Sequence, residues 1–375
     1  MRILTVNVPY AGHVNPTLPL TKELVKRGHQ VTYINAEEFR SKIEASGAVF
    51  LPYADFPAGL TDGQKKRRCF QAAYNTAMAL EEPHDLLIYE MFFYPGYEIA
   101  RKKNIPAIRQ FAQPAWSEET WKTAPPVFKV SAKLIDAQVM GKKKKAAMGL
   151  LSKSMADAII HDAPAFNIVY IPEKFQKCRN SFGPDYTFLV PVREQDKSNS
   201  TIPYHQMLRP IVYISLGSLI SSRGFCKECI RAFGGKSLSV ILNTGRIDPS
   251  TLGDIPQNIY AYSFVPQIEV LEHADAFLTH CGMNSVNEAM STGVPMVAMP
   301  FVNDQLENAS QIVNLGLGRR VRSFPSSGGE LYNTALNVYE DKTIKKNVSA
   351  MRKEILAQQG WEPILQKIEA LAARG

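Results

Sequence analysis

The chain has 375 residues, of which 45% are hydrophobic and 21% charged, and its formal net charge is +8. This length is enough for two or three domains with sizeable cores, and the composition excludes a disordered chain. No apolar run reaches the roughly 18 residues of a membrane-spanning helix. The N-terminus has the pattern of a β-strand and not that of a cleavable signal. We therefore expect a cytoplasmic globular protein.

The basic excess is concentrated in residues 122–153, which hold eight lysines and one acid. A nucleic-acid-binding protein would more often spread basic residues over a face with aromatic residues between them, so we expect no nucleic-acid partner. The segment includes the run Lys142, Lys143, Lys144 and Lys145. Charge blocks of this kind are usually solvated helix faces or loops. The alternative is peripheral contact with an anionic membrane surface or an acidic partner.

The five cysteines are too few, and odd in number, for a disulfide scaffold. Cys226 and Cys229 form one C-x-x-C pair. A structural zinc site would need a second pair, or two histidines at a matching spacing, and none is present. We therefore expect no metal site, and a redox role for the pair is weakly supported.

The first hundred residues alternate between strand-like and helix-like segments, each closed by turn residues. The predicted strands are 2–8, 30–34, 49–53, 85–90 and 105–108, and the predicted helices are 16–27, 37–45 and 97–103. Strands that alternate with helices indicate a parallel sheet with helices on both faces.

The same alternation restarts after residue 210. The predicted strands are 211–216, 239–243, 276–279 and 295–299, and the predicted helices are 225–233, 284–291, 304–314, 344–358 and 362–372. Residues 192–209 are polar and contain Pro203, which is typical of a linker. We therefore predict an α/β protein of two doubly wound domains, 1–200 and 205–375, in which the last helix is free to pack back on the first domain. Ligands of such sheets bind beyond the carboxyl ends of the strands, and a cleft between domains is a preferred site.

The loop after the first strand, residues 12–16, has the sequence GHVNP and carries His13. A histidine at this edge can act as a base near neutral pH, although it can equally cap or pack. In the usual doubly wound order the fourth strand lies beside the first, which brings Glu90 to the same edge. A carboxylate behind a histidine fixes its tautomer and stabilises the imidazolium. The alternative is that Glu90 is a structural acid.

A denser set of polar residues follows the strands of the second domain. The loop 280–285 opens a helix, so its backbone N–H groups favour a phosphate, as does the turn at 216–218. Glu288 suits ribose hydroxyls, Phe264 offers a flat face for a base, and Asp304 and Gln305 suit a sugar. Each residue alone could merely cap a helix or pack in a core, but their order along one edge favours a common site.

These residues resemble the signature of family 1 glycosyltransferases that use nucleotide sugars, and the bacterial macrolide-type subgroup in particular. The similarity is carried by the block 264–305, by the GHVNP loop and by the turn Ser215-Leu216-Gly217-Ser218. It spans nearly the whole chain in the expected order. No G-x-G-x-x-G follows the first strand, which argues against a nicotinamide enzyme.

The resemblance implies a GT-B fold, in which two Rossmann-like domains face a central cleft, with no bound cofactor or metal and a UDP- or dTDP-sugar as co-substrate. It implies that His13 is the general base of an inverting transfer, with Glu90 behind it. The implied donor-binding residues are Gly12, Ser218, Phe264, Val265, Gln267, His280, Gly282, Asn284, Ser285, Glu288, Asp304 and Gln305. The first domain would bind the acceptor, a small and largely apolar natural product, against aromatic residues that include Phe92, Phe93 and Trp116.

One residue departs from the family pattern, which usually has aspartate where this chain has Glu90. The side chain is one methylene longer, so the pair with His13 is expected to be re-angled, bridged by water or absent. Three alternatives stay open: a glycolipid-forming transferase at a membrane surface, a nucleotide-sugar epimerase, and a non-catalytic auxiliary protein that binds sugar nucleotides. The sequence names neither the sugar nor the acceptor, and it leaves the oligomeric state open.

Overall fold

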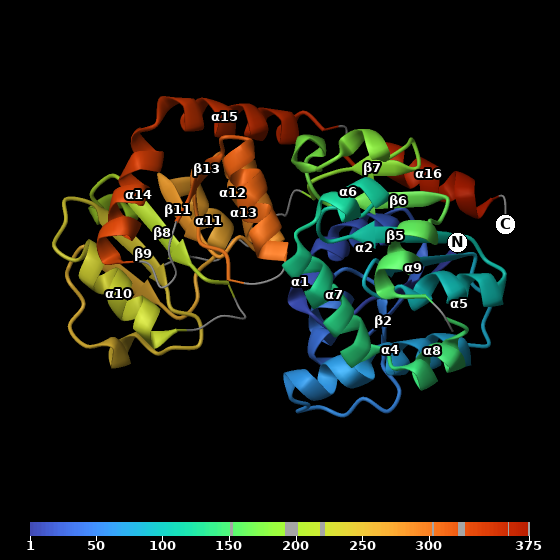
Figure 1. The fold of residues 1–375 in the computed structure, drawn as a ribbon. Helices are drawn as coiled ribbons and strands as arrows, with labels where there is room; N and C mark the ends of the chain where they lie inside the picture. The colour runs from blue at the N-terminus through green and yellow to red at the C-terminus, as the bar shows by residue number, and fades with distance from the viewer. Residues whose placement is uncertain are drawn as a thin grey trace. The chain divides into compact units, whose positions relative to one another are not determined.

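The computed structural model describes residues 1–150, 153–191, 202–217, 222–301, 304–321, 327–358 and 360–373. The chain divides into two compact units. Unit 1 comprises Met1–Pro191 and Gln359–Gly375, and unit 2 comprises Val192–Gln358. Each unit is built around one β-sheet with helices packed against it (Figure 1). Most of the predicted linker, residues 192–209, lies outside the described residues.

The described part of unit 1 contains a seven-stranded parallel sheet in the order β3-β2-β1-β4-β5-β6-β7. Its strands are β1 (Arg2–Val6), β2 (Gln30–Asn35), β3 (Val49–Pro52), β4 (Leu86–Glu90), β5 (Ala107–Phe111), β6 (Phe166–Val169) and β7 (Tyr186–Phe188). The central strands β4 and β5 are buried along their whole length. This explains the apolar run at residues 86–89, because helices cover both faces of a parallel sheet, whereas Arg109 and Gln110 of β5 are buried polar residues.

The helices of unit 1 connect these strands and cover the sheet. They are α1 (Ala11–Val14), α2 (Leu18–Lys26), α3 (Arg40–Glu44), α4 (Asp62–Ala79), α5 (Pro95–Lys103), α6 (Glu118–Thr123), α7 (Pro126–Val139), α8 (Lys142–Met148), α9 (Met155–His161) and α16 (Glu362–Ala372). Helix α4 begins with a capping box in which Thr61 and Gln64 exchange side-chain and backbone hydrogen bonds.

The C-terminal helix α16 belongs to unit 1. Its residues Ile364, Leu365 and Ile368 lie in the same core cluster as the strands β1 and β4. At its outer side the Arg27 guanidinium at the end of α2 forms ion pairs with Glu362 (2.6 Å) and Glu369 (2.7 Å). Apolar burial fixes the helix, and the exposed ion pairs add little to its stability.

The described part of unit 2 repeats the same topology with six parallel strands, in the order β10-β9-β8-β11-β12-β13. The strands are β8 (Ile211–Ser215), β9 (Ser239–Asn243), β10 (Ile259–Tyr262), β11 (Ala276–Thr279), β12 (Met296–Ala298) and β13 (Gly318–Arg320). The helices are α10 (Arg223–Phe233), α11 (Gln267–His273), α12 (Met283–Thr292), α13 (Asp304–Asn314), α14 (Gly328–Glu340) and α15 (Lys342–Leu356).

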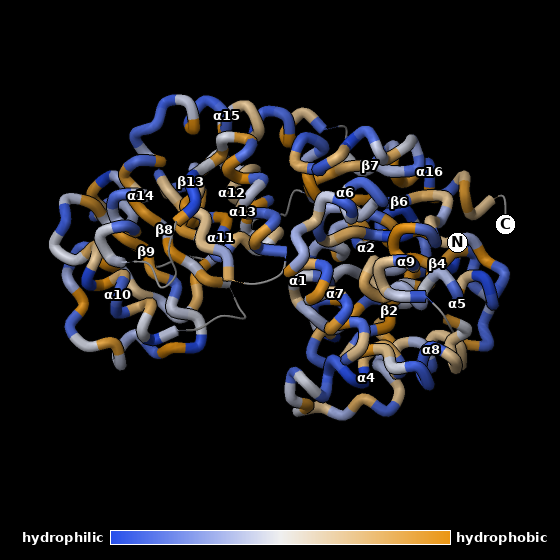
Figure 2. Tube along the Cα trace, viewed as in Figure 1, coloured by the Kyte–Doolittle hydropathy of each residue, from blue (hydrophilic) through white to orange (hydrophobic). Residues whose placement is uncertain are grey.

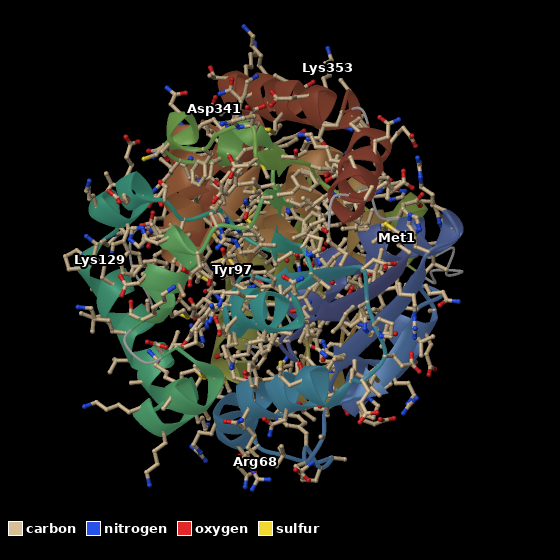
Figure 3. All side chains as sticks on the ribbon, turned by 90° about the vertical axis from the view of Figure 1, so that its right-hand side faces the viewer. Met1, Arg68, Tyr97, Lys129, Asp341 and Lys353 are labelled. Atoms are coloured by element: carbon tan, nitrogen blue, oxygen red, sulfur yellow. The ribbon has the colours of Figure 1, made fainter. Side chains whose placement is uncertain are left out.

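Polar and apolar residues are sorted between surface and core as this architecture requires. Figure 2 shows apolar stretches along the inner strands β8 and β9 and polar stretches along the outer helix α15. Figure 3 shows charged side chains such as Arg68 of α4 and Lys353 of α15 at the periphery, and both are exposed. The predicted doubly wound α/β fold is confirmed, as is the predicted position of the fourth strand beside the first.

Candidate functional site

In unit 1 the candidate base and its carboxylate come from neighbouring strands. His13 lies on the short helix α1 that follows β1, and Glu90 is the last residue of β4. The two strands pair in register, with Val6 opposite Tyr89. The sheet therefore brings the two side chains to one edge, where His13 Nδ1 lies 3.1 Å from Glu90 Oε1.

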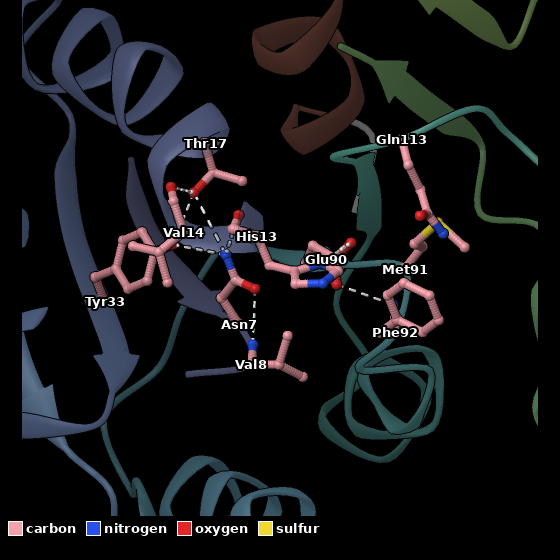
Figure 4. Close-up of polar contacts among 10 residues, drawn as sticks. All are labelled: Asn7, Val8, His13, Val14, Thr17, Tyr33, Glu90, Met91, Phe92 and Gln113. Atoms are coloured by element: carbon pink, nitrogen blue, oxygen red, sulfur yellow. Dashed lines mark hydrogen bonds and ion pairs between the residues drawn. The ribbon is translucent and has the colours of Figure 1, made fainter. Parts of the chain in front are cut away.

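The Glu90 carboxylate faces His13 with one oxygen and a backbone N–H with the other. Glu90 is fully buried, and its second oxygen, Oε2, accepts a hydrogen bond from the Phe92 backbone N–H at 3.0 Å. Oε1 and His13 Nδ1 are within ion-pair distance, and both atoms are buried. At this distance the contact is direct, which excludes both a bridging water and an absent pair in this structure. Figure 4 shows the imidazole directed toward the carboxylate.

Aromatic rings extend from His13 along unit 1. The His13 and Phe92 rings meet edge to face with centroids 5.0 Å apart, and Phe92 meets Trp116 in the same way at 6.1 Å. Trp116 in turn contacts Trp121 and Phe128. Phe93, in contrast, is fully buried, and its ring lies 5.8 Å from that of Phe70. A ring in this position has no exposed face in this structure.

Four polar residues behind His13 were not predicted from the sequence. Asn7, Thr17, Tyr33 and Tyr53 are buried. Asn7 donates to the His13 carbonyl, and Thr17 donates to the Val14 carbonyl. Tyr53 donates to the Asn7 carbonyl, and Tyr33 joins Asn7 to Thr17. The signal that could have found them is the presence of polar residues at buried positions of an otherwise apolar sheet, because buried polar groups need partners.

In unit 2 the central residue is His280, in the loop between β11 and α12. The ring is partly exposed, whereas its Nδ1 atom is buried. Burial lowers the pKa of His280 to about 4, so the ring is neutral at pH 7. Two glycines make room for it. A Cβ at Gly217 would lie 2.5 Å from its Cε1 atom, and a Cβ at Gly282 would collide with Nε2.

The backbone of the His280 loop is constrained by residues on neighbouring elements. Cys281 has a left-handed φ of 66°, which is uncommon for a residue with a side chain. The Asn308 side chain of α13 donates a hydrogen bond to the Cys281 carbonyl at 3.0 Å. Asn308 is buried, and the sequence analysis did not single it out. Gly282 is the N-cap of α12 and supplies no capping side chain.

The polar residues of α11 and α12 form a connected set. Gln267 Nε2 donates to Glu288 Oε2 at 2.6 Å and to Ser285 Oγ at 3.1 Å. Its Oε1 accepts from Tyr213 Oη at 3.0 Å, a contact that the sequence did not reveal. Tyr213 stands in the middle of β8, so it ties the set to the sheet. The glutamine and the glutamate that were predicted to share a role therefore lie side by side.

Five of the remaining predicted donor residues lie around the same edge of the unit 2 sheet. Phe264 is 82% exposed between β10 and α11, and Val265 next to it is buried. Gln305 Oε1 accepts from the Phe301 backbone N–H at 3.0 Å. Asp304 is the first residue of α13. Asn284 lies in the first turn of α12. Gly12, on α1, belongs to unit 1, and Ser218 lies outside the described residues.

The lysine run and the cysteine pair have mostly local contacts. Lys144 donates to the Val139 carbonyl, and Lys145 pairs with buried Asp136 at 2.6 Å, whereas Lys142 and Lys143 are exposed. The two cysteines of the C-x-x-C pair are free and buried on α10. Within the described ranges no three His, Cys, Asp or Glu side chains gather as metal ligands would. Nor is any described helix long and apolar enough to cross a bilayer.

Comparison with known proteins settles the family. Residues 192–365 match the family model described as "UDP-glucoronosyl and UDP-glucosyl transferase". The chain is also 31% identical to the NDP-glycosyltransferase YjiC of Bacillus subtilis (strain 168), over 98% of this chain and 96% of that protein. The chain belongs to this glycosyltransferase family. The resemblance stated from the sequence is thereby confirmed.

Further relatives and solved structures agree with this assignment. The oleandomycin glycosyltransferase of Streptomyces antibioticus is 28% identical, over 96% of this chain and 88% of the relative. The structure of a glycotransferase of kitacinnamycin superposes with a TM-score of 0.86 at 27% identity, covering 99% of each chain. That of the calicheamicin glycosyltransferase CalG4 gives 0.81 at 26%, covering 100% of this chain and 98% of that one. The protein is therefore a glycosyltransferase of the GT-B fold, which bears out the predicted enzyme class.

Proposed function

We propose that this glycosyltransferase moves a sugar from a UDP- or dTDP-sugar to a hydroxyl of a small, largely apolar acceptor, with inversion at the anomeric carbon. The observation that carries the proposal is the position of His13 Nδ1, 3.1 Å from the fully buried Glu90 carboxylate. A histidine backed by a buried carboxylate is a typical arrangement for proton abstraction. Unit 1 would hold the acceptor and unit 2 the donor.

In this mechanism the acceptor hydroxyl gives its proton to His13 Nε2 as its oxygen attacks the anomeric carbon. The new C–O bond forms on the face opposite the nucleotide, and the electrons of the breaking bond pass to the diphosphate. Glu90, which faces Nδ1, stabilises the imidazolium that forms. A positioned base of this kind contributes about 10²- to 10⁴-fold in rate.

The donor would bind at the His280 edge of unit 2. The leaving diphosphate would meet the N-terminus of the ten-residue helix α12 together with His280, Gly282, Asn284 and Ser285. A neutral His280 can donate one hydrogen bond to the diphosphate and remains uncharged when no ligand is bound. Gln267 and Glu288, already in contact, would bind the ribose hydroxyls. Asp304 and Gln305 would hold the sugar.

The nucleotide base would stack on Phe264, whose large exposure is otherwise unfavourable for an aromatic ring. The Val265 backbone would pair with uracil or thymine. The YjiC relative is named for an NDP-sugar donor, which supports this class of donor for the present chain.

The acceptor would pack against the rings that continue from His13, of which Phe92 and Trp116 lie nearest. Aromatic walls suit apolar aglycones, because they bury a large area at little conformational cost. The relatives named for oleandomycin and the structures named for kitacinnamycin and calicheamicin support a natural product as the acceptor.

Two measurements test the proposal. Thermal unfolding without added metal should shift upward with UDP or dTDP compounds and not with NAD or ATP. A ligand at 100 times its Kd stabilises by about 2.7 kcal/mol. His13→Ala should then lower kcat by about 10²- to 10⁴-fold and leave the nucleotide shift intact. Unchanged turnover would refute the role of His13, and a wild type that binds nucleotide without any turnover would favour an auxiliary protein.

A further inference from the structure

The backbone of His13 accepts a hydrogen bond from a buried side chain that directly follows β1. Asn7 follows the last residue of β1, and its Nδ2 atom donates to the His13 carbonyl at 3.0 Å. Asn7 is 1% exposed, so water does not compete for this contact. The helix α1 that carries His13 has four residues and no side-chain cap at its N-terminus. Such a short helix is not stable by itself and takes its position from contacts of this kind.

The second hydrogen of the Asn7 amide begins a chain of hydrogen bonds that also ends next to His13. Nδ2 donates to Tyr33 Oη at 2.9 Å, Tyr33 Oη can then donate to Thr17 Oγ1 at 2.7 Å, and Thr17 Oγ1 donates to the Val14 carbonyl at 2.8 Å. Burial raises the pKa of Tyr33 to about 12, so its hydroxyl keeps the proton that it donates. Figure 4 shows this group of side chains between β1, β2 and the His13 loop.

The network admits one orientation of the Asn7 amide. Its Oδ1 accepts from the Val8 backbone N–H at 2.7 Å, and both Nδ2 hydrogens are used by His13 and Tyr33. A flipped amide would turn an oxygen toward the His13 carbonyl and leave the Val8 N–H facing a donor. Both changes are costly in a buried site. The orientation is therefore fixed, and with it the position of the His13 backbone relative to β1.

From this arrangement we propose that Asn7 is a positioning residue that sets the distance and angle between the His13 imidazole and Glu90. Tyr33 and Thr17 act through Asn7 by holding its amide. Glu90 is held from the other side, at the end of β4, by the Phe92 N–H. The inference rests on the proposed role of His13 as base and adds a residue that does not touch substrate.

The chain supplies a matched control on the adjacent strand. Asn35 is the last residue of β2, is 0% exposed, and its Oδ1 accepts from the next backbone N–H, that of Ala36, at 2.7 Å. Asn7 makes the same contact with Val8 at the same distance. The difference is that only the Asn7 amide reaches the His13 loop, because Asn35 Nδ2 makes no hydrogen bond within the described residues.

The test compares Asn7→Ala with Asn35→Ala in the full-length protein, with a UDP- or dTDP-sugar that supports turnover. Asn7→Ala should lower kcat at least about tenfold, since a misplacement near 1 Å can cost 10²-fold. The KM values for both substrates should change less than kcat, because most of the proposed binding residues that the structure describes make no contact with Asn7. Asn35→Ala should change kcat by no more than about twofold once the folded fraction is matched. A kcat loss that equals the loss of folded protein, or an equal kcat loss in both variants, would overturn the proposal.

A double variant separates this inference from the proposed function. In a His13→Ala background, Asn7→Ala should change the residual rate by less than about twofold, because the group that it positions is gone. If His13→Ala lowers kcat but the effect of Asn7→Ala is the same in both backgrounds, the positioning role is refuted and the base stands. If His13→Ala leaves kcat unchanged, both are refuted. Should Asn7→Ala not fold, Tyr33→Phe is used in its place, with a smaller loss of kcat and the same dependence on His13 expected.

Discussion

Each unit places a histidine at the carboxyl edge of its sheet, after one of the two central strands that lie side by side, and surrounds it differently. His13 follows the first strand of unit 1 and faces a carboxylate from the adjacent strand β4. His280 follows β11, the strand beside the first strand of unit 2, and its ring lies between two glycines. Burial alone accounts for the lowered pKa of His280. The order of the strands thus fixes the position of each histidine in its sheet. The groups next to the imidazole determine whether the ring is suited to accept a proton or to stay neutral.

This contrast has a physical basis. A carboxylate beside an imidazole stabilises the protonated ring, which a base becomes after it accepts a proton. An apolar surrounding with close backbone disfavours the charged ring and keeps a neutral hydrogen-bond donor. The environment of His13 therefore suits the proposed abstraction of a proton. The environment of His280 suits the proposed binding of an anionic leaving group.

The largest effect is expected from removing the charge behind His13. Glu90→Gln keeps the shape of the side chain but cannot stabilise the imidazolium, so kcat should fall by about 10²-fold or more. Nucleotide binding, measured by calorimetric titration, should not change, since the proposed diphosphate and base contacts lie in unit 2. Glu90→Asp is the matched variant that keeps the charge, and it should retain more activity than Glu90→Gln. Equal losses in the two variants would show that the charge at this position is not what matters.

The next effect concerns the pH dependence of stability through His280. Its pKa is about 4 in the folded protein and about 6.5 when unfolded, so the unfolded chain binds more protons between these values. The stabilising contribution is complete above pH 6.5 and is lost as the pH falls toward 4. It amounts to at most about 3 kcal/mol, and the partial exposure of the ring reduces it.

Denaturant unfolding of the wild type and of His280→Gln at pH 7 and pH 4.5 measures this contribution. The difference in unfolding free energy between the two pH values should be smaller in the variant. His205→Gln is the control, because that side chain is exposed and its removal should leave the pH dependence as it was. If His280→Gln and the wild type respond equally to pH, burial of His280 does not control its protonation.

The smallest effect is expected from crowding His280 in unit 2. Gly217 has a left-handed φ of 74°, and a Cβ there would lie 2.5 Å from the ring. Gly217→Ala should therefore lower the unfolding free energy by about 1–3 kcal/mol and weaken nucleotide binding. Gly329→Ala, where an added Cβ meets nothing within 4 Å, should be neutral or slightly stabilising. Thermal unfolding with and without nucleotide compares the two, and a similar response in both would contradict the close packing around His280.

Much of the fold could be predicted from the sequence because its signals are local. The helices α13 and α16 were predicted with their observed bounds, as were the strands β9 and β11, since each combines a clear pattern with distinct ends. The helix α4 was missed, because its lysines and arginines hide the apolar face that carries Phe70 and Ala73. The helices α6 to α9 were also missed, in a segment where charge dominates the pattern.

The membrane interpretation of the lysine run stays a prediction, now with fewer charges available to it. Lys144 and Lys145 are engaged with protein groups, which leaves Lys142 and Lys143 as the exposed members of the run. The sequence alone could not tell the exposed lysines from the engaged ones, because the four residues are identical. Only the helix α8 determines which of the four side chains face solvent.

The sequence by itself determined the alternation of strands and helices, the parallel pairing of the strands, and the family to which the chain belongs. These follow from residue patterns within short segments and from motifs at fixed spacing. Tertiary structure decided that Glu90 lies 3.1 Å from His13, that Asn7, bonded to Tyr33, donates to the His13 carbonyl, and that Gly217 makes room for His280. Each of these relations joins residues from different elements, and their distances exist only once the strands have paired.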